Sequence, residues 1–155
     1  GDVVSSTRIR QLIQAGNVER AATLLGRTYG IRGPVVHGMQ LGQAMGWPTA
    51  NLRIPTERVV PPDGVYAARA VHGAETYDAI AYIGTRPTFG AGERLLEVNL
   101  LDRTCDLYGQ EITVQFVSRV RGDHAFASAD ELSTQITRDV EQARVSLRNI
   151  PQGVP

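Results

Sequence analysis

The chain contains no lysine. All sixteen basic residues, in a sequence of 155, are arginine. A P-loop needs the lysine of its GK[ST] motif on the nucleotide phosphates, and a protein kinase needs the lysine of its third strand. Both classes are therefore excluded, and a protein of this composition that handles ATP must do so in another way.

Cysteine, net charge and long apolar runs are scarce as well. The lone cysteine, Cys105, excludes an internal disulfide and a multi-cysteine zinc site, and it suits a reducing compartment, with the cytoplasm as default. Sixteen acidic residues cancel the arginines, so the chain lacks the basic field that drives non-specific nucleic-acid binding. The sequence has neither an apolar signal core nor a membrane-length apolar run. We expect one compact domain with no membrane span and no nucleic-acid partner.

The hydrophobic pattern predicts helices at both ends of the chain and strands between them. Residues 7–26 read as two short helices, with Asn17 as a cap of the second. From Ile31 to about Ser118 the period is two, and turn residues recur at PPDG, HGAE, GTRP and FGAGE, which is typical of an antiparallel sheet or barrel. In its last stretch one face should hold Ile112, Val114, Phe116 and Ser118.

A final helix should begin at the capping box of Ser128 and Glu131. Its apolar residues recur at helical spacing and predict a helix that lies across the barrel: Leu132, Ile136, Val140, Ala143 and Leu147.

The stretch GMQLGQAMGWPTANL, residues 38–52, places three glycines before a stiff segment. Pro48 fixes its own φ, so Thr49 and Asn51 would present a hydroxyl and an amide from a rigid backbone. Such neutral oxygens could hold a Mg–ATP complex, with the glycines close to phosphate. From spacing alone, a plain loop between two strands is the stronger interpretation.

Two further stretches could carry chemistry. In RLLEVNLLD, residues 94–102, Glu97 and Asn99 share one face amid leucines, which suits a general base, although a solvated edge strand fits the pattern equally well. In RVRGDHAF, residues 119–126, a cation and an aromatic ring could grip a planar ligand, although such loops are usually only solvated. Three scattered histidines make no metal-ligand spacing.

Taken together, GMQLGQAMGWPTANL, YIGTRPTF, LEVNLLD, DLYGQ and RGDHAF resemble the riboflavin kinase (flavokinase) family in order and spacing. The resemblance implies a small six-stranded antiparallel Greek-key barrel that is mainly β, with N-terminal helices and a C-terminal helix packed on it. It also implies transfer of phosphate from Mg–ATP to the 5′-hydroxyl of riboflavin, giving FMN. On this interpretation PTAN is the metal site and the loop is not merely structural.

The resemblance assigns roles to individual residues. Glu97 would be the catalytic base and would lie near the flavin, and Thr49 and Asn51 would hold the metal. The remaining assignments form two sets. The ATP side would comprise Gly38, Gln43, Thr49, Asn51, Leu100, Asp102 and Tyr108, and the flavin side Arg121, His124 and Phe126 beside Glu97. Two departures bear on ATP affinity, since the family commonly has a basic residue where this chain has Gln43 and another near His124 and Ala125.

SSTRIR, Ser5 to Arg10, resembles the end of the adenylyltransferase module that precedes this kinase in bifunctional FAD synthetases of bacteria. We therefore interpret residues 1–29 as remnant and linker helices, 30–150 as the kinase domain and 151–155 as a loose tail. An adenylyltransferase domain would be the partner in the full-length protein, and FAD synthesis by this chain should be lost. The rest of that module, including its HxGH motif, is missing from the sequence.

Two rival functions stay open at this point. A flavin-binding or regulatory module would keep the barrel without a reaction, and it would be indifferent to Glu97→Gln because it needs no base. A nucleic-acid-binding barrel is disfavoured by zero net charge and few aromatic residues.

Overall fold

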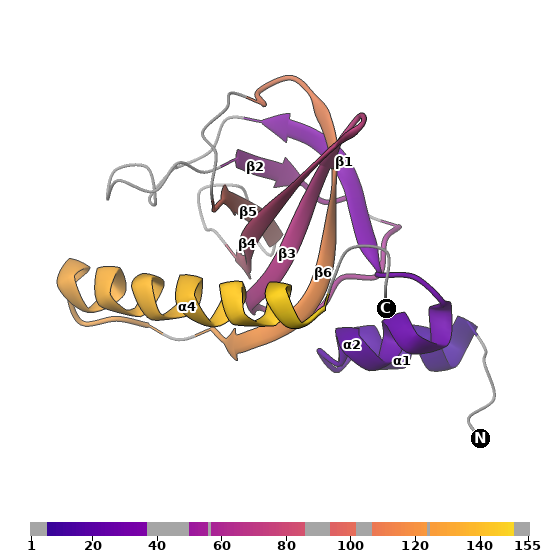
Figure 1. Cartoon of the computed structure of the whole chain (residues 1–155), viewed down its shortest axis with the longest axis horizontal. Coiled ribbons are helices and arrows are strands. Elements are labelled where there is room, and N and C mark those ends of the chain that lie inside the picture. The colour runs from indigo at the N-terminus through magenta and orange to yellow at the C-terminus, as the bar shows by residue number, and fades with distance from the viewer. Residues whose placement is uncertain are drawn as a thin grey trace.

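A closed six-stranded barrel flanked by helices forms the molecule in its computed structural model, which describes residues 6–36, 50–55, 57–85, 94–101, 107–123 and 125–150. The described elements are α1 (Ser6–Gln14), α2 (Val18–Leu25), β1 (Gly30–Val36), β2 (Ala50–Arg53), β3 (Gly64–His72), β4 (Glu75–Thr85), β5 (Arg94–Leu100), β6 (Glu111–Gly122) and α4 (Ala129–Asn149). The expected helices at both ends and strands between them are confirmed (Figure 1).

The strands close in the order β1-β2-β5-β4-β3-β6, and every neighbouring pair is antiparallel. β3, β4 and β5 are consecutive neighbours, and β6 returns to lie beside β3, which is the Greek-key arrangement. Closure leaves no unpaired edge. The predicted six-stranded antiparallel Greek-key barrel is confirmed.

The barrel interior is the main core. Alternate residues of each strand point inward and meet there, including Leu52, Ile83, Leu96, Val98 and Phe116. Tyr66 packs edge-on against Phe116, with ring centroids 5.4 Å apart, and so fills the interior with aromatic surface.

The predicted alternation along β6 ends at Phe116. Ile112, Val114 and Phe116 lie in the interior core as expected. The β3–β6 register then shifts between Ala67 and Ala68, so Ser118 lies opposite Ala67, a residue of the outer cluster. Because directly paired residues share a face, Ser118 shares a face with Ala67 and not with Phe116.

α4 lies across the outside of the barrel (Figure 1). Ser128 Oγ accepts a hydrogen bond from the backbone N–H of Glu131, which confirms the predicted N-cap, and the Glu131 carboxylate accepts one from Ala127 N–H. The predicted stripe is also confirmed: Val140, Ala143 and Leu147 are buried against outward-facing residues of β3, β4 and β6. The outer face of the barrel therefore carries an apolar cluster under α4.

The two short helices close one end of the barrel. Asn17 caps α2 by accepting a hydrogen bond from Arg20 N–H, and Val18 is part of the interior core. The turn between the helices approaches β6 closely, since a Cβ on Gly16 would lie 3.2 Å from Arg119 Cδ. α1 and α2 are thus packed on the barrel rather than held away from it.

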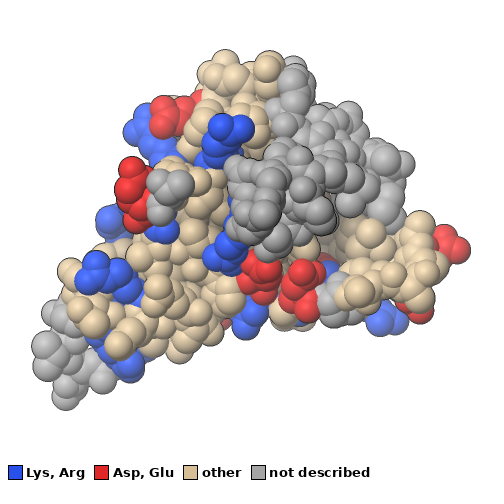
Figure 2. All heavy atoms as spheres, turned by 180° about the vertical axis from the view of Figure 1, so that it is seen from behind, with Lys and Arg blue, Asp and Glu red and all other residues tan. Residues whose placement is uncertain are grey.

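Basic and acidic side chains lie interspersed on the face shown in Figure 2. Among the described residues, none of the helices has both the length and the apolar character needed to cross a bilayer.

Candidate active site

A row of paired positions crosses the outer face of five strands. Asn51 on β2 lies opposite Glu97 on β5, Glu97 opposite Tyr82 on β4, Tyr82 opposite Val65 on β3, and Val65 opposite Arg121 on β6. Directly paired side chains point to the same face, and neighbouring strands lie about 4.8 Å apart. Candidate residues from distant parts of the sequence therefore share one line, with Glu97 and Arg121 separated by three strand spacings.

One end of this row is a buried polar pair. Asn51 is only 1% exposed and Glu97 only 8%. Neither Oδ1 nor Nδ2 of Asn51 has a hydrogen-bond partner among the described residues, and the same holds for Oδ1 of Asn99, two positions after Glu97 on the same face. An unmet buried polar group costs about 1–3 kcal/mol, so these amides indicate a place built for a ligand.

The alternative interpretation of Glu97, a solvated residue on an edge strand, is wrong. β5 lies between β2 and β4 in a closed barrel, and the Glu97 side chain is buried.

The donor set at this end suits a hard cation. The described residues include no group of three or more His, Cys, Asp or Glu side chains that could hold a metal by themselves. An amide oxygen such as that of Asn51, however, is a ligand that Mg²⁺ accepts alongside waters and substrate phosphates. The unpartnered Asn51 amide therefore fits a Mg–nucleotide complex better than a transition metal.

Two more residues assigned to the ATP side lie near this pair. Tyr108 is 53% exposed, and the next residue, Gly109, donates a backbone hydrogen bond to Val35 at 3.1 Å. Val35 precedes the residue opposite Asn51 on β1. Leu100 ends β5 and packs on the interior core, which leaves its backbone rather than its side chain for a ligand.

The other end of the row carries a cation and an aromatic ring. The guanidinium carbon of Arg121 lies 5.4 Å from the centroid of the Phe126 ring. Phe126 also lines a surface depression of about 550 Å³ together with Ala125 and the first turns of α4. The structure thus brings together the two described residues of the predicted flavin side, Arg121 and Phe126.

Close backbone packing fixes this end of β6. A Cβ on Gly64, the first residue of β3, would lie 2.5 Å from the carbonyl oxygen of Arg121. Only glycine allows the two strands to approach so closely there, so Gly64 helps to fix the position of Arg121 near the end of β6.

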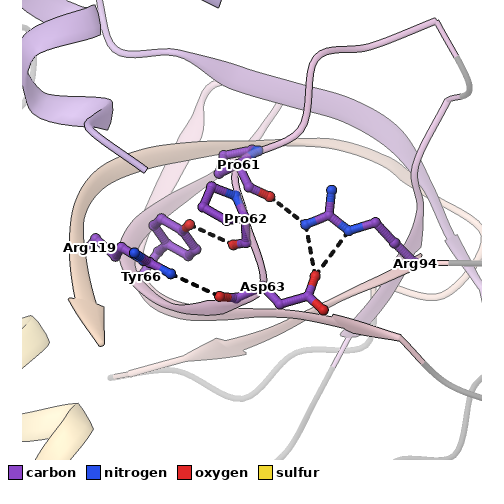
Figure 3. A network of polar contacts seen from close by, with 6 residues as sticks. All are labelled: Pro61, Pro62, Asp63, Tyr66, Arg94 and Arg119. Carbon is purple, nitrogen blue, oxygen red and sulfur yellow. Dashed lines mark hydrogen bonds and ion pairs between the residues drawn. The ribbon is translucent and has the colours of Figure 1, made fainter. Parts of the chain in front are cut away.

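A network of polar contacts holds the PPDG turn against β5 and β6 (Figure 3). Arg94, the first residue of β5, donates to Asp63 Oδ1 at 2.8 and 3.0 Å and to the carbonyl of Pro61, and Arg119 donates to the carbonyl of Asp63 at 3.0 Å. The Tyr66 hydroxyl donates to the Pro62 carbonyl at 2.7 Å, and burial raises the pKa of Tyr66 to about 12. The network anchors the strand that carries Glu97 three residues after Arg94.

Five predicted site residues lie outside the described residues: Gly38, Gln43, Thr49, Asp102 and His124. Their roles stay predictions.

Two polar residues of α4 that the sequence interpretation did not single out contact the flavin end of the row. Asp139 accepts hydrogen bonds from Arg121 and Gln135. A signal for Asp139 was present, because it falls on the apolar stripe between Ile136 and Ala143, where a charged residue needs a partner.

Comparison with known proteins finds matches over most of the chain. A family model described as riboflavin kinase (Flavokinase) matches residues 25–147. A bifunctional riboflavin kinase/FMN adenylyltransferase from Escherichia coli K12 is 45% identical over 143 residues, covering 91% of this chain and 45% of the relative. The corresponding Bacillus subtilis 168 protein is 39% identical over 143 residues, with 90% and 45% covered. The chain thus spans a little under half the length of these curated relatives.

Two solved structures are similar to the barrel. A crystal structure described as a macrolide-efflux protein from Streptococcus pneumoniae superposes with a TM-score of 0.85 at 41% identity, covering 91% of this chain and 46% of that chain. The riboflavin kinase of Trypanosoma brucei superposes with a TM-score of 0.54 at 24% identity, covering 77% and 79%, which supports the fold alone.

Proposed function

The chain belongs to the riboflavin kinase family, and from that membership we propose that it transfers the γ-phosphate of Mg–ATP to the 5′-hydroxyl of riboflavin, giving FMN and ADP. The observation that carries this proposal is the buried pair of Asn51 and Glu97 on the outside of the barrel, where the Asn51 amide is unpartnered among the described residues. A buried amide with unmet polar atoms beside a buried carboxylate is costly for a module that only folds.

Asn51 would hold the magnesium ion of the nucleotide complex through its amide oxygen, with Thr49 as the second residue of the predicted metal site. Bound magnesium would neutralise charge on the phosphates during transfer. The remaining predicted ATP contacts are Gly38, Gln43, Asp102 and Tyr108, with the backbone at Leu100. Most of the rate enhancement would come from positioning, as expected for a loose phosphoryl-transfer transition state.

Glu97 would act as the general base. Its side chain lies on the same face as Asn51 and directly opposite it, at the separation of neighbouring strands. A carboxylate there can accept the proton of the ribityl 5′-hydroxyl as the hydroxyl oxygen attacks the phosphorus. Proton acceptance of this kind contributes typically about 10²- to 10⁴-fold to a rate.

Phe126 and Arg121, with His124, would form the flavin side. An aromatic ring and a guanidinium offer flat surfaces on which a planar polar ring system can stack. The depression of about 550 Å³ beside Phe126 has a volume in the range of small-molecule sites. On this assignment the ribityl chain would run from a flavin near Arg121 and Phe126 toward the base at Glu97.

By analogy with the bifunctional relatives, we propose that an adenylyltransferase domain is the partner of this domain. The riboflavin kinase domain would comprise residues 30–150, and the cytoplasm would be its compartment.

The test is to incubate the purified chain with riboflavin, ATP and Mg²⁺ and to separate FMN from FAD by chromatography. We expect FMN that depends on the metal, with no FMN in a chelator control, and no FAD. FMN at an undiminished rate with the chelator would refute the magnesium role. Riboflavin binding without any FMN would refute the kinase and favour a flavin-binding module.

A further inference from the structure

Asp139 makes a two-pronged contact with Arg121 across the interface between α4 and β6. Arg121 Nε lies 3.0 Å from both carboxylate oxygens, and Nη2 lies 2.9 Å from Oδ2. Both partners are shielded, with the Asp139 side chain 4% and the Arg121 side chain 17% exposed. A side-on pair of this kind fixes the plane of the guanidinium as well as its position.

This contact continues to the surface depression. Gln135 Nε2, one turn earlier on α4, donates to Asp139 Oδ1 at 3.0 Å, and Gln135 lines the depression together with Phe126. Phe126 in turn lies against the Arg121 guanidinium. The four side chains therefore form a continuous chain of contacts whose two ends, Gln135 and Phe126, both border the depression, while Asp139 does not line it.

We infer that Asp139 is a positioning residue for flavin binding: through its two-pronged contact it sets the plane of the Arg121 guanidinium against Phe126 and so builds the stacking wall of the flavin site. The inference rests on the proposed function. It adds Asp139, held by Gln135, to the residues that determine riboflavin affinity, although Asp139 does not touch the ligand by this assignment.

Docking of α4 does not explain the pair. The helix is already held by its apolar stripe and, at its C-terminal end, by Arg69, which donates to the carbonyls of Leu147 and Ile150. Buried ion pairs are often no more stabilising than apolar residues of similar volume, so docking alone gives no reason for a carboxylate at position 139. Orientation of a guanidinium does give one, because a carboxylate that accepts two parallel hydrogen bonds fixes the plane of the guanidinium, which an apolar side chain cannot do.

Asp139→Asn tests the role of the carboxylate with little change in shape. We expect the KM for riboflavin to rise about tenfold, the change that corresponds to about 1.4 kcal/mol, with kcat and the KM for ATP near wild type. Arg69→Met is the matched control, because it loosens the other end of α4. It should lower the thermal midpoint without raising the riboflavin KM. An unchanged riboflavin KM in Asp139→Asn, or an equal rise in Arg69→Met, would overturn the inference.

A double-mutant cycle separates positioning from a direct contact. If Asp139 acts only through Arg121, then adding Asp139→Leu to Arg121→Met leaves riboflavin affinity at the level of Arg121→Met, whereas independent contacts would give additive losses. The apolar pair also keeps the experiment interpretable if Asp139→Asn folds poorly, since replacing both charges by apolar residues tends to preserve stability. Wild-type riboflavin affinity in this folded double variant would sink the inference.

Measurements on the wild-type chain distinguish a failure of the proposed function from a failure of the inference about Asp139. A wild-type chain that neither binds riboflavin, measured by quenching of flavin fluorescence, nor forms FMN would overturn the proposed function and the inference with it. A wild-type chain that forms FMN, with a riboflavin KM indifferent to position 139, would overturn the inference alone.

Discussion

Two regions of the outer barrel face differ in how far their buried polar side chains find partners within the protein. Around Glu97, the amides of Asn51 and Asn99 include buried atoms that no described residue satisfies. Under α4, Asp139 pairs with Arg121, and Arg69 Nη2 donates to the last carbonyls of the helix. Arg69 Nε and Ser118 Oγ lack a hydrogen-bond partner among the described residues, although Arg69 Nε lies 3.7 Å from the Asp78 carboxylate. On the function proposed above, the first region gives up stability that a bound ligand would restore, whereas the contacts in the second hold the helix.

The difference matters because removing a side chain should have opposite consequences in the two regions. A polar group with unmet hydrogen bonds can be replaced by an apolar group at little cost to folding, whereas a satisfied buried charge leaves its partners unpaired when it is removed. Variants that change activity and stability in opposite ways would therefore confirm the division.

The largest effect is expected for Glu97→Gln. The amide cannot accept the hydroxyl proton, so kcat should fall by about 10²- to 10⁴-fold while the riboflavin KM stays similar. Steady-state FMN formation measures kcat and the riboflavin KM. A thermal melt of the same preparation checks that the variant is folded. Undiminished kcat would remove Glu97 from the role of base.

Asn51→Leu should weaken Mg–ATP binding without lowering stability. We expect Mg–ATP affinity to fall about 10- to 100-fold, since a contact with a charged group contributes about 1.5–3 kcal/mol. The thermal midpoint should stay level or rise, because two unmet polar atoms disappear from the interior of the site. Titration of ATP at fixed Mg²⁺ gives the affinity, and calorimetry gives the thermal midpoint. A strongly lowered midpoint would show that the Asn51 amide has hydrogen-bond partners in the folded chain.

Arg69→Met should lower stability and spare the chemistry. Burial lowers the pKa of Arg69, yet the charged group holds two backbone carbonyls at the end of α4. We expect the free energy of unfolding to fall by about 1.5–3 kcal/mol. Each kcal/mol should lower the thermal midpoint by about 2–4 °C. Arg32→Met is the control, since the Arg32–Glu111 ion pair is exposed and should contribute at most about 1 kcal/mol. Equal destabilisation by the two variants would contradict the special role of Arg69.

The smallest effect is expected for Tyr66→Phe, in the network that anchors β5. Loss of the hydrogen bond to Pro62 should cost about 1 kcal/mol at pH 8. Because burial raises the pKa of Tyr66 from 10.0 to about 12, the folded chain keeps a proton that the unfolded chain releases. The contribution of Tyr66 to wild-type stability is thus complete below pH 10, and it declines between pH 10 and 12 by about 1.4 kcal/mol per pH unit.

Urea unfolding at several pH values checks this behaviour. Above pH 10 the unfolding free energy should fall less steeply with pH in Tyr66→Phe than in wild type. Part of the decline should remain in the variant because burial also raises the pKa of Tyr29. Identical slopes in the two proteins would contradict the assignment to Tyr66.

Local patterns predicted much of the fold. The caps at Asn17 and Ser128, the stripe of α4 and the alternation of β5 all appear where the sequence indicated, because caps and periodicities depend on residues within a few positions of one another. The face of Ser118 was predicted wrongly. A register shift between β3 and β6 decides it, and pairing between distant strands leaves no mark in the period of either strand.

The site divides in the same way. That Glu97 and Asn99 share a face followed from the two-residue period of one strand. That Asn51 lies opposite Glu97, and that Arg121 lies in the same row, required closure of the barrel in the order β1-β2-β5-β4-β3-β6. Asp139 could have been flagged as a charge on an apolar stripe, but only the packing of α4 on β6 identifies its partner.

The sequence by itself determined the element types, the helix caps, the alternating faces of β5 and of β6 as far as Phe116 and, through motif resemblance, the family, since all of these depend on residue identity and short-range spacing. Tertiary structure alone decided which strands are neighbours, that β5 has no free edge, and that the amide of Asn51, the carboxylate of Glu97 and the guanidinium of Arg121 share one outer row. The physical reason is that hydrogen-bonded register and burial arise between segments far apart in the chain, where hydrophobic closure selects one pairing from many that local preferences allow.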